Sequence, residues 1–305
     1  MGFSLKAAAE YGLLRATLGT IGRLSFARAG AIGARLGTLG YAPFGVRRAV
    51  VERQIAAAFP TWPRGEVERV AREAYASLGR TTVEAAILPR YGVSEVLDLF
   101  EGADGWELIE EALAAGNGLL FVAGHLGNWE LGGAYLAARG VPMDAVARHM
   151  ANPYVDGYIT RTRHRLGMRV VHDEKAVREV PRAIRQNRAV AMLVDQGTIG
   201  LASTWVKFFG RYAKTPRGPA TFALRLGAPV IFGTAIRQPS GKYRMFFEAV
   251  PTEPTGDRDA DIDRIVADYT ATLERWVRRA PEQYFWHHRR WKHQRPGTPP
   301  ELGEP

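Results

Sequence analysis

The sequence has no cysteine among its 305 residues. This absence excludes disulfide bonds, thiolate metal ligands and a cysteine nucleophile. The sequence also has no Gly-x-Ser-x-Gly segment, so a serine hydrolase built around a nucleophile elbow is not expected. Three histidines near the C-terminus, His287, His288 and His293, have no carboxylate or cysteine at the spacing of a metal site, so no metal is predicted.

Long hydrophobic runs are absent from the N-terminal region. Charged residues such as Lys6, Glu10 and Arg15 interrupt every window of about 18 residues, so neither a secretory signal nor a transmembrane helix is expected. Lys6 and Glu10 are spaced to share one face of a helix, and so are Arg28 and Arg35. Such an amphipathic segment either lies in a membrane interface or covers the globular domain, and the sequence leaves both possibilities open.

Positive charge is in excess. Lys and Arg number 41 against 31 Asp and Glu, which gives a net charge of +10. This excess favours an anionic partner, such as nucleic acid, phospholipid head groups or an acidic carrier protein. The cluster from Phe285 to Arg295 combines basic and aromatic side chains, which suits a lipid interface or single-stranded nucleic acid. The segment from Pro296 to Pro305 is rich in proline and poor in apolar side chains, so we expect residues 297–305 to form a disordered tail.

The hydrophobic patterns predict the fold. Residues 1–100 read as a helical, membrane-associating region that includes a helix at 66–86. Residues 101–296 then alternate between buried strands and helices, which predicts one α/β domain with a mostly parallel central sheet and helices on both faces. The expected strands are 118–123, 143–147, 168–171, 189–194, 229–236 and 243–250, of which the last would close the sheet. The expected helices are 106–115, 129–139, 153–166, 176–186, 216–226 and 262–277.

The segment Ala-Gly-His-Leu-Gly-Asn-Trp-Glu, residues 123–130, lies where a buried strand meets a helix. In an open parallel sheet this junction is at the carboxyl edge, where ligands bind. If His125 and Glu130 were both helical they would lie about 140° apart, since a helix turns about 100° per residue. We therefore expect His125 in the loop and Glu130 in the first helical turn. From there the carboxylate could reach the imidazole, fix its tautomer and raise its basicity.

Polar residues follow two further strands at the same expected edge. Arg148 follows one strand, and Asp195 with Gln196 follows another. Because a parallel sheet gathers such positions, Asp195 is a second candidate to orient His125, and Arg148 is a candidate to hold a phosphate or a developing oxyanion. The alternatives are an aspartate that only caps a helix and an arginine that is only solvated.

These segments resemble a known family. Residues 124–130, Gly-His-Leu-Gly-Asn-Trp-Glu, are similar to the His-x4-Asp/Glu motif of the glycerolipid acyltransferases. The chain looks like one branch of them, the lipid A biosynthesis acyltransferases of the lauroyl/myristoyl type, which include the mycobacterial phosphatidylinositol mannoside acyltransferases. The resemblance covers residues 10–296. Further similar segments are Ala58-Phe-Pro60, Arg148 with Asn152-Pro153, Val194-Asp-Gln196, Val206-Lys-Phe-Phe-Gly210 and Pro281-Glu-Gln-Tyr-Phe-Trp-His-His-Arg-Arg-Trp-Lys292.

The resemblance implies an acyl transfer. His125 would be the general base for a lipid hydroxyl, oriented by Glu130 or Asp195. The residues that bind substrate would be Arg148, Asn128, Asn152 and Gln196. The donor would be an acyl carrier protein or coenzyme A thioester, and no metal or redox cofactor would be needed. The acceptor would be a membrane glycolipid similar to a lipid A precursor, with a phosphatidylinositol mannoside or a lysophospholipid as alternatives.

The resemblance also implies a location at the cytoplasmic face of the inner membrane. Many members of the family have an N-terminal transmembrane helix, whereas this segment is charged throughout, which favours peripheral or monotopic attachment. Two rival functions stay open at this point. A hydrolase would use the same His125 and carboxylate to activate water. A basic nucleic-acid-binding module would bind oligonucleotides with a steep salt dependence.

Overall fold

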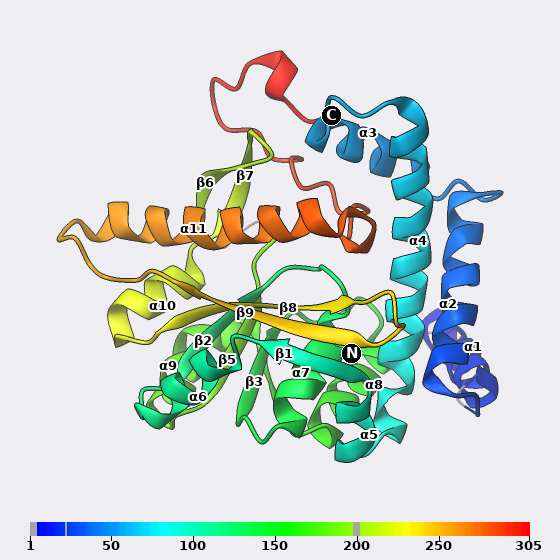
Figure 1. Ribbon diagram of the computed structural model, residues 1–305, viewed down its shortest axis with the longest axis horizontal. Helices are drawn as coiled ribbons and strands as arrows, with labels where there is room; N and C mark the ends of the chain where they lie inside the picture. The colour runs from blue at the N-terminus through cyan, green and yellow to red at the C-terminus, as the bar shows by residue number, and fades with distance from the viewer. Residues whose placement is uncertain (1–4, 22, 198–201) are drawn as a thin grey trace.

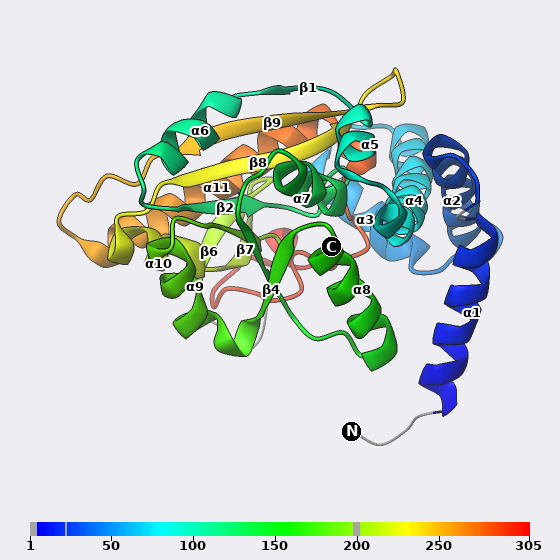
Figure 2. The same cartoon turned by 90° about the horizontal axis from the view of Figure 1, so that it is seen from below.

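The computed structural model describes residues 5–21, 23–197 and 202–305. In this part of the chain, seven strands form a sheet in the order β1-β9-β8-β2-β5-β3-β4. Figure 2 shows β1, β9, β8 and β2 side by side at one end of this order. The strands are β1 (Phe100–Asp104), β2 (Leu119–Ala123), β3 (Met143–Ala147), β4 (Met168–His172), β5 (Ala189–Leu193), β8 (Val230–Arg237) and β9 (Tyr243–Val250). Neighbouring strands are parallel, except that β8 and β9 are antiparallel. The predicted mostly parallel sheet is confirmed.

Helices cover both faces of this sheet, as predicted. One face carries α6 (Trp106–Ala114) and α7 (Trp129–Ala138), and α8 (Pro153–Arg165) lies beside β4. The other face carries α9 (Ala176–Arg185), α10 (Gly218–Leu226) and α11 (Arg258–Arg279). Figure 1 shows α11 above β8 and β9, with α7 below them. All five residues of β2 are buried, and they alternate between the two cores. Leu120 and Val122 pack in the core under α9 to α11, whereas Leu119 and Phe121 pack in the core under α6 and α7. A strand covered on both sides reads as a continuous apolar run for this reason.

A helical layer precedes the sheet. It consists of α1 (Leu5–Ile21), α2 (Phe26–Tyr41), α3 (Arg48–Ala58), α4 (Arg64–Ile87), a 3-10 turn at Leu88–Arg90 and α5 (Val93–Asp98). Helix α4 stands upright at one end of the sheet, and α2 lies along it (Figure 1). The two helices approach closely because glycines face the partner: a Cβ on Gly37 would collide with the carbonyl oxygen of Tyr75. The predicted N-terminal helical region is confirmed.

The helical layer also leaves apolar side chains exposed. Four of them lie in the C-terminal half of α2 and in the loop after it: Leu36, Leu39, Phe44 and Val46. Leu5 on α1 and Val93 on α5 are exposed as well. Within the described residues, no helix has the length and apolarity that crossing a membrane would require. Attachment of this layer to a membrane interface stays a prediction.

Three features differ from the sequence-based expectations or extend them. Strand β1 pairs in parallel with the outer side of β9, so 243–250 does not close the sheet. Strands β6 (Ser203–Phe208) and β7 (Arg211–Pro216) form a separate antiparallel hairpin, and because Pro216 ends β7, helix α10 begins two residues later than expected. The tail expected to be disordered carries a 3-10 turn at Pro300–Leu302, and Glu304 pairs with Arg289.

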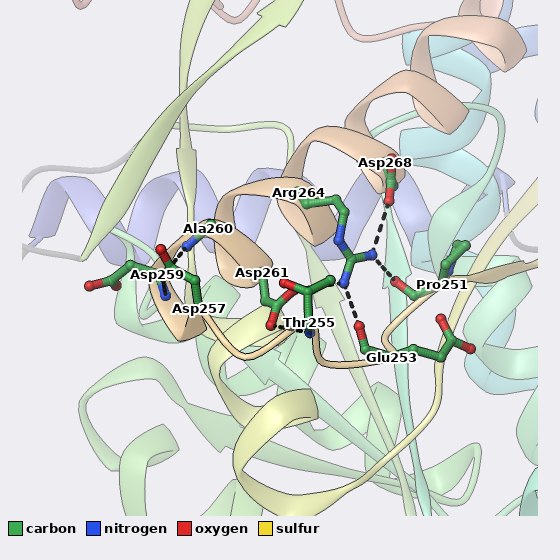
Figure 3. A network of polar contacts seen from close by, with 9 residues as sticks. All are labelled: Pro251, Glu253, Thr255, Asp257, Asp259, Ala260, Asp261, Arg264 and Asp268. Carbon is green, nitrogen blue, oxygen red and sulfur yellow. Dashed lines mark hydrogen bonds and ion pairs between the residues drawn. The ribbon is translucent and has the colours of Figure 1, made fainter.

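Polar contacts anchor the start of the last helix (Figure 3). The Asp257 carboxylate caps α11 by accepting hydrogen bonds from the backbone N–H groups of Asp259 and Ala260, both at 3.1 Å. Arg264 donates to the carbonyl oxygen of Glu253 at 2.7 Å and so ties the incoming loop to the helix. Helix α11 is thereby fixed over β8 and β9, and the chain that follows it enters the candidate site.

Candidate active site

Two neighbouring strands end side by side at the candidate site. Strands β2 and β5 pair in parallel, with Ala123 opposite Leu193. His125 is two residues beyond Ala123, and Asp195 is two residues beyond Leu193. Residues that follow two paired positions by the same number of residues stay close together at the edge of a parallel sheet. The two side chains therefore meet, although 70 positions separate them in the sequence.

His125 and Asp195 form a buried pair, 18% and 3% exposed. His125 Nδ1 lies 2.7 Å from Asp195 Oδ1, and the His125 backbone N–H donates to Oδ2 at 2.9 Å. Burial alone would lower the pKa of His125, but the charge and hydrogen bond of Asp195 outweigh it and raise this pKa. Burial also opposes ionisation of Asp195, yet His125 holds the pKa of that carboxyl down at about 2. With Nδ1 engaged, Nε2 is the ring nitrogen left for a substrate.

The segment after α11 lies over the base. The Phe285 backbone N–H donates to the carbonyl oxygen of His125 at 2.9 Å, and the Gly127 N–H donates to the carbonyl oxygen of Gln283 at 3.0 Å. The His125 ring makes a T-shaped contact with Trp129, with centroids 4.9 Å apart, and a tilted contact with Phe285 at 5.8 Å. The His125 loop is thus held from outside the sheet, and its ring is bracketed by aromatic side chains.

Buried polar groups of the same segment surround Asp195. Burial, together with the charge of Asp195 and a hydrogen bond to it, raises the pKa of Tyr284 well above its ordinary value. Arg290 is 4% exposed and donates to the Thr215 hydroxyl at 2.6 Å, and its charge favours the ionised Asp195. The expectation that this cluster presents tryptophans to a lipid interface is wrong, because Trp286 and Trp291 are 1% and 0% exposed.

Glu130 lies in the first turn of α7, as expected, but it pairs with another residue. Arg163 on α8 donates to it through Nε at 3.1 Å and through Nη2 at 2.5 Å. The two side chains are 19% and 18% exposed, so this is a largely buried bidentate ion pair. Of the two carboxylates considered for orienting His125, Asp195 makes the hydrogen bond, whereas Glu130 acts on the ring through its charge.

The two predicted asparagines are helix caps. Asn128 is 0% exposed and accepts a hydrogen bond from the Leu131 N–H at 3.0 Å, which caps α7. A contact between Asn128 and a substrate would require this side chain to leave its partners. Asn152 accepts from the Tyr154 N–H at 3.1 Å, which caps α8, and donates to the carbonyl oxygen of Ala7 on α1 at 3.0 Å.

The two remaining predicted residues lie in different places, Arg148 at the surface and Gln196 beside the His125 ring. The Arg148 side chain is 56% exposed and pairs with Asp173 at 2.9 Å. Gln196 Nε2 lies 3.4 Å from each ring nitrogen of His125. The substrate-binding roles of Arg148, Asn152 and Gln196 stay predictions.

An apolar cavity of about 80 Å³ lies beside the base. Trp129, which contacts the His125 ring, forms part of its wall, and so does the ion pair of Glu130 and Arg163. Gly233 on β8 lets the Phe121 ring, another part of the wall, pack against the strand, since a Cβ there would collide with that ring. Four methionines line the cavity and give it an adaptable apolar wall: Met143, Met168, Met192 and Met245.

Sequence reasoning missed several residues of the site. Trp129 and Phe285 belong to the recognised segments, but nothing in their spacing showed that they bracket one ring. Arg163 lies on an expected helix, and no pattern pointed to Glu130 as its partner. Glu84 on α4 accepts a hydrogen bond from Asn128 at 2.9 Å. It had a detectable pattern, because its position continues the apolar stripe of α4 and a carboxylate there is unusual.

Comparisons with known proteins show which sequences this chain is similar to. A family model described as "Bacterial lipid A biosynthesis acyltransferase" matches residues 10–293. The chain is 26% identical to the lipid A biosynthesis palmitoleoyltransferase of Escherichia coli K12, over 86% of this chain and 84% of that protein. It is also 26% identical to the lauroyltransferase of the same strain, over 88% and 86% of the two chains. A phosphatidylinositol mannoside acyltransferase of Mycolicibacterium smegmatis is 28% identical over 52% of each chain.

Proposed function

This chain belongs to the family of bacterial lipid A biosynthesis acyltransferases, and from that premise we propose that His125 is the general base of its transfer reaction. The donor is an acyl carrier protein or coenzyme A thioester. The acceptor is a hydroxyl of a membrane glycolipid similar to a lipid A precursor, and the products are an ester and a free thiol. The observation that carries the proposal is the buried His125–Asp195 pair beside an apolar cavity.

The proton moves through His125 Nε2. As the acceptor hydroxyl attacks the thioester carbonyl, Nε2 takes its proton, and the new C–O bond forms as the carbonyl becomes a tetrahedral oxyanion. The oxyanion then collapses, the C–S bond breaks, and the imidazolium returns the proton to the departing sulfur. Atoms and charge balance in this sequence without a metal or a redox cofactor.

Asp195 prepares the ring for both halves of this step. Its hydrogen bond to Nδ1 keeps the proton of the neutral imidazole on that nitrogen, so Nε2 presents a lone pair to the acceptor. Its negative charge then stabilises the imidazolium that forms. Because the pKa of Asp195 is held at about 2, the carboxylate stays ionised throughout.

The apolar cavity is assigned to the acyl chain. It lies against Trp129, so a chain bound there would hold its carbonyl near the imidazole. Burying methylene groups supplies about 0.8 kcal/mol each, which can be used to position the thioester. The net charge of +10 favours an acidic carrier or the phosphates of coenzyme A, and it also favours an anionic membrane surface. We place the enzyme at the cytoplasmic face of the inner membrane, attached peripherally through the helical layer.

The test is an acyl-transfer assay with purified protein, a fatty acyl thioester and a lipid A precursor. The His125→Ala variant should lose about 10²- to 10⁴-fold in kcat, the usual contribution of a positioned base. His164→Ala is the matched control, because this exposed histidine on α8 undergoes the same change outside the site. Parental transfer by folded His125→Ala protein would contradict the proposal.

The rival functions give different results in the same set of assays. Thiol release that needs no lipid acceptor would favour a hydrolase. Strong oligonucleotide binding, combined with failure to float with anionic liposomes, would favour a nucleic-acid-binding protein. Mass spectrometry of lipids from a strain without the gene identifies the acceptor, because the missing acyl chain distinguishes a lipid A precursor from a phosphatidylinositol mannoside.

A further inference from the structure

A buried carboxylate on α4 lies behind the turn that carries the proposed base. Glu84 is 1% exposed, although it belongs to the helical layer and not to the α/β domain. Its Oε2 accepts hydrogen bonds from Asn128 Nδ2 at 2.9 Å and from the Tyr243 hydroxyl at 2.6 Å. Arg80, one turn earlier on α4, places Nη1 3.7 Å from Oε1. A carboxylate this deep in the fold needs such partners, because an unpaired buried charge is strongly destabilising.

Asn128 connects this carboxylate to the catalytic turn. It lies three residues after His125, and the oxygen and nitrogen of its side-chain amide have different partners. The oxygen accepts the Leu131 N–H and caps α7, while the nitrogen donates to Glu84. The position of the turn between β2 and α7 therefore depends on a residue of α4.

The turn is held from two sides. On the α4 side, the Thr81 hydroxyl donates to the carbonyl oxygen of Gly127 at 3.3 Å. On the β8 side, the Asn128 N–H donates to the carbonyl oxygen of Ala235 at 3.0 Å. A Cβ on Gly127 would collide with that same Ala235 oxygen, so the turn has little room to move toward the sheet. The contacts from α4 decide whether it moves the other way.

We propose that Glu84 is a positioning residue of the acyl transfer, which holds the His125 imidazole in place through Asn128. The inference rests on the proposed function, because the position of His125 matters to the rate only if it is the base. It extends that function by making the helical layer part of the active site. Helix α2 belongs to the same arrangement, since a Cβ on Gly30 would collide with Glu84 Oε1. A displacement of about 1 Å at a reacting group can cost about 100-fold in rate.

The competing explanation is that Glu84 only joins two layers of the fold. In that case its replacement would lower stability, and any effect on the rate would follow the loss of folded protein. The two explanations can be distinguished by exchanging the hydrogen-bond donor, Asn128, and the acceptor, Glu84. Asn128→Asp sets two carboxylates against each other, Glu84→Gln removes the charge but keeps an oxygen that can accept from Asn128, and the double variant restores one donor facing one acceptor. All three changes are nearly isosteric, and an aspartate still caps α7.

The experiment measures kcat, KM for the thioester and the melting temperature of each variant. Asn128→Asp should lower kcat about 10- to 100-fold and change KM for the thioester less, since the base moves with the turn but most of the cavity wall lies on the strands and on other helices. The double variant Glu84→Gln/Asn128→Asp should recover to within about threefold of the parent. Glu73→Gln is the control, because this partly exposed carboxylate lies on the same helix and pairs with Arg69 away from the turn.

Two results would overturn the proposal. One is a folded Asn128→Asp protein with the parental kcat, and the other is a double variant whose loss equals the product of the two single losses. If Asn128→Asp does not fold alone, recovery of folding and rate in the double variant supports the pairing, and failure of both counts against it. Parent and His125→Ala proteins are assayed alongside. Absence of transfer by the parent refutes the proposed function, whereas a parental rate in Asn128→Asp refutes only the role of Glu84.

Discussion

Two acid–base pairs lie within a few residues of each other in this site, and they differ in partner and in surroundings. His125 and Glu130 belong to one short segment, yet His125 pairs with Asp195 and Glu130 pairs with Arg163. The first pair engages Nδ1 and leaves Nε2 to a 3.4 Å contact with Gln196. In the second pair, Arg163 donates to both oxygens of Glu130. We infer that the first pair performs chemistry and the second holds α7 against α8.

The comparison shows that proximity in the sequence is a poor guide to partnership at the edge of a parallel sheet. Glu130 is five positions after His125, and the strand-to-helix junction turns the two side chains in different directions. Seventy residues separate His125 from Asp195, but paired strands bring both to the same edge.

The largest expected difference between the two pairs is in kcat when the carboxylate of each pair is replaced. Asp195→Asn should lower kcat by about 10²- to 10⁴-fold, because the ring loses the charge that fixes its tautomer and stabilises its protonated form. Glu130→Gln should lower kcat less than about tenfold, since only a charge at longer range is lost. The assay is acyl transfer at saturating substrate.

Asp156→Asn provides the matched control for this pair of variants. Asp156 also pairs with a histidine, His149, at 2.9 Å, but that histidine is 53% exposed. The control should keep the parental rate. A larger loss of kcat in Glu130→Gln than in Asp195→Asn would show that the Glu130 pair performs the chemistry and that the His125–Asp195 pair does not.

A smaller effect, on stability, is expected from the second pair. Arg163→Met leaves the Glu130 carboxylate without its partner in a largely buried place, so the free energy of unfolding should fall by about 1–3 kcal/mol. The double variant Glu130→Met/Arg163→Met should be less destabilised than either single variant, because it leaves no unpaired charge. Urea unfolding measures both. Unchanged stability together with a collapse of kcat in Arg163→Met would show that this pair takes part in the chemistry.

The smallest effect is expected at Arg148. Its side chain is more than half exposed and pairs with Asp173, so Arg148→Ala should change stability by less than about 0.5 kcal/mol. If Arg148 holds a phosphate of donor or acceptor, KM for that substrate should rise about threefold to tenfold, as for the loss of one exposed charge-assisted contact. An unchanged KM for both substrates would remove Arg148 from the site.

Much of the architecture could be predicted because the cores are patterned locally. The apolar run of β2 and the periodic face of α11 each indicate burial within one element. Strand β1 was missed because its sequence, Phe-Glu-Gly-Ala-Asp, lies at a sheet edge where burial is slight. The hairpin of β6 and β7 was missed because it pairs outside the main sheet.

The candidate site could be predicted only in part for a related reason. His125 and Asp195 were found because the ends of parallel strands share an edge, and this follows from the order of elements. The partners Arg163 and Glu84 depend on how α8 and α4 pack against α7, and no spacing in the sequence determines that. The buried place of Trp286 and Trp291 was missed because their basic neighbours suggested a surface, whereas Arg290 is itself buried and donates to Lys214 and Thr215.

The central claim is that Asp195, and not Glu130, orients the His125 ring and is the main group that stabilises its protonated form. The most direct measurement is an NMR titration of the His125 imidazole nitrogens in the parent, Asp195→Asn and Glu130→Gln proteins. In the parent we expect a neutral ring with its proton on Nδ1 and a pKa above the ordinary value, so activity is lost as the pH falls through that pKa. In Asp195→Asn the pKa of His125 should fall and the acid limb of activity should move to lower pH, while Glu130→Gln should shift both less. A larger fall in Glu130→Gln, or a parental ring with its proton on Nε2, would contradict the account.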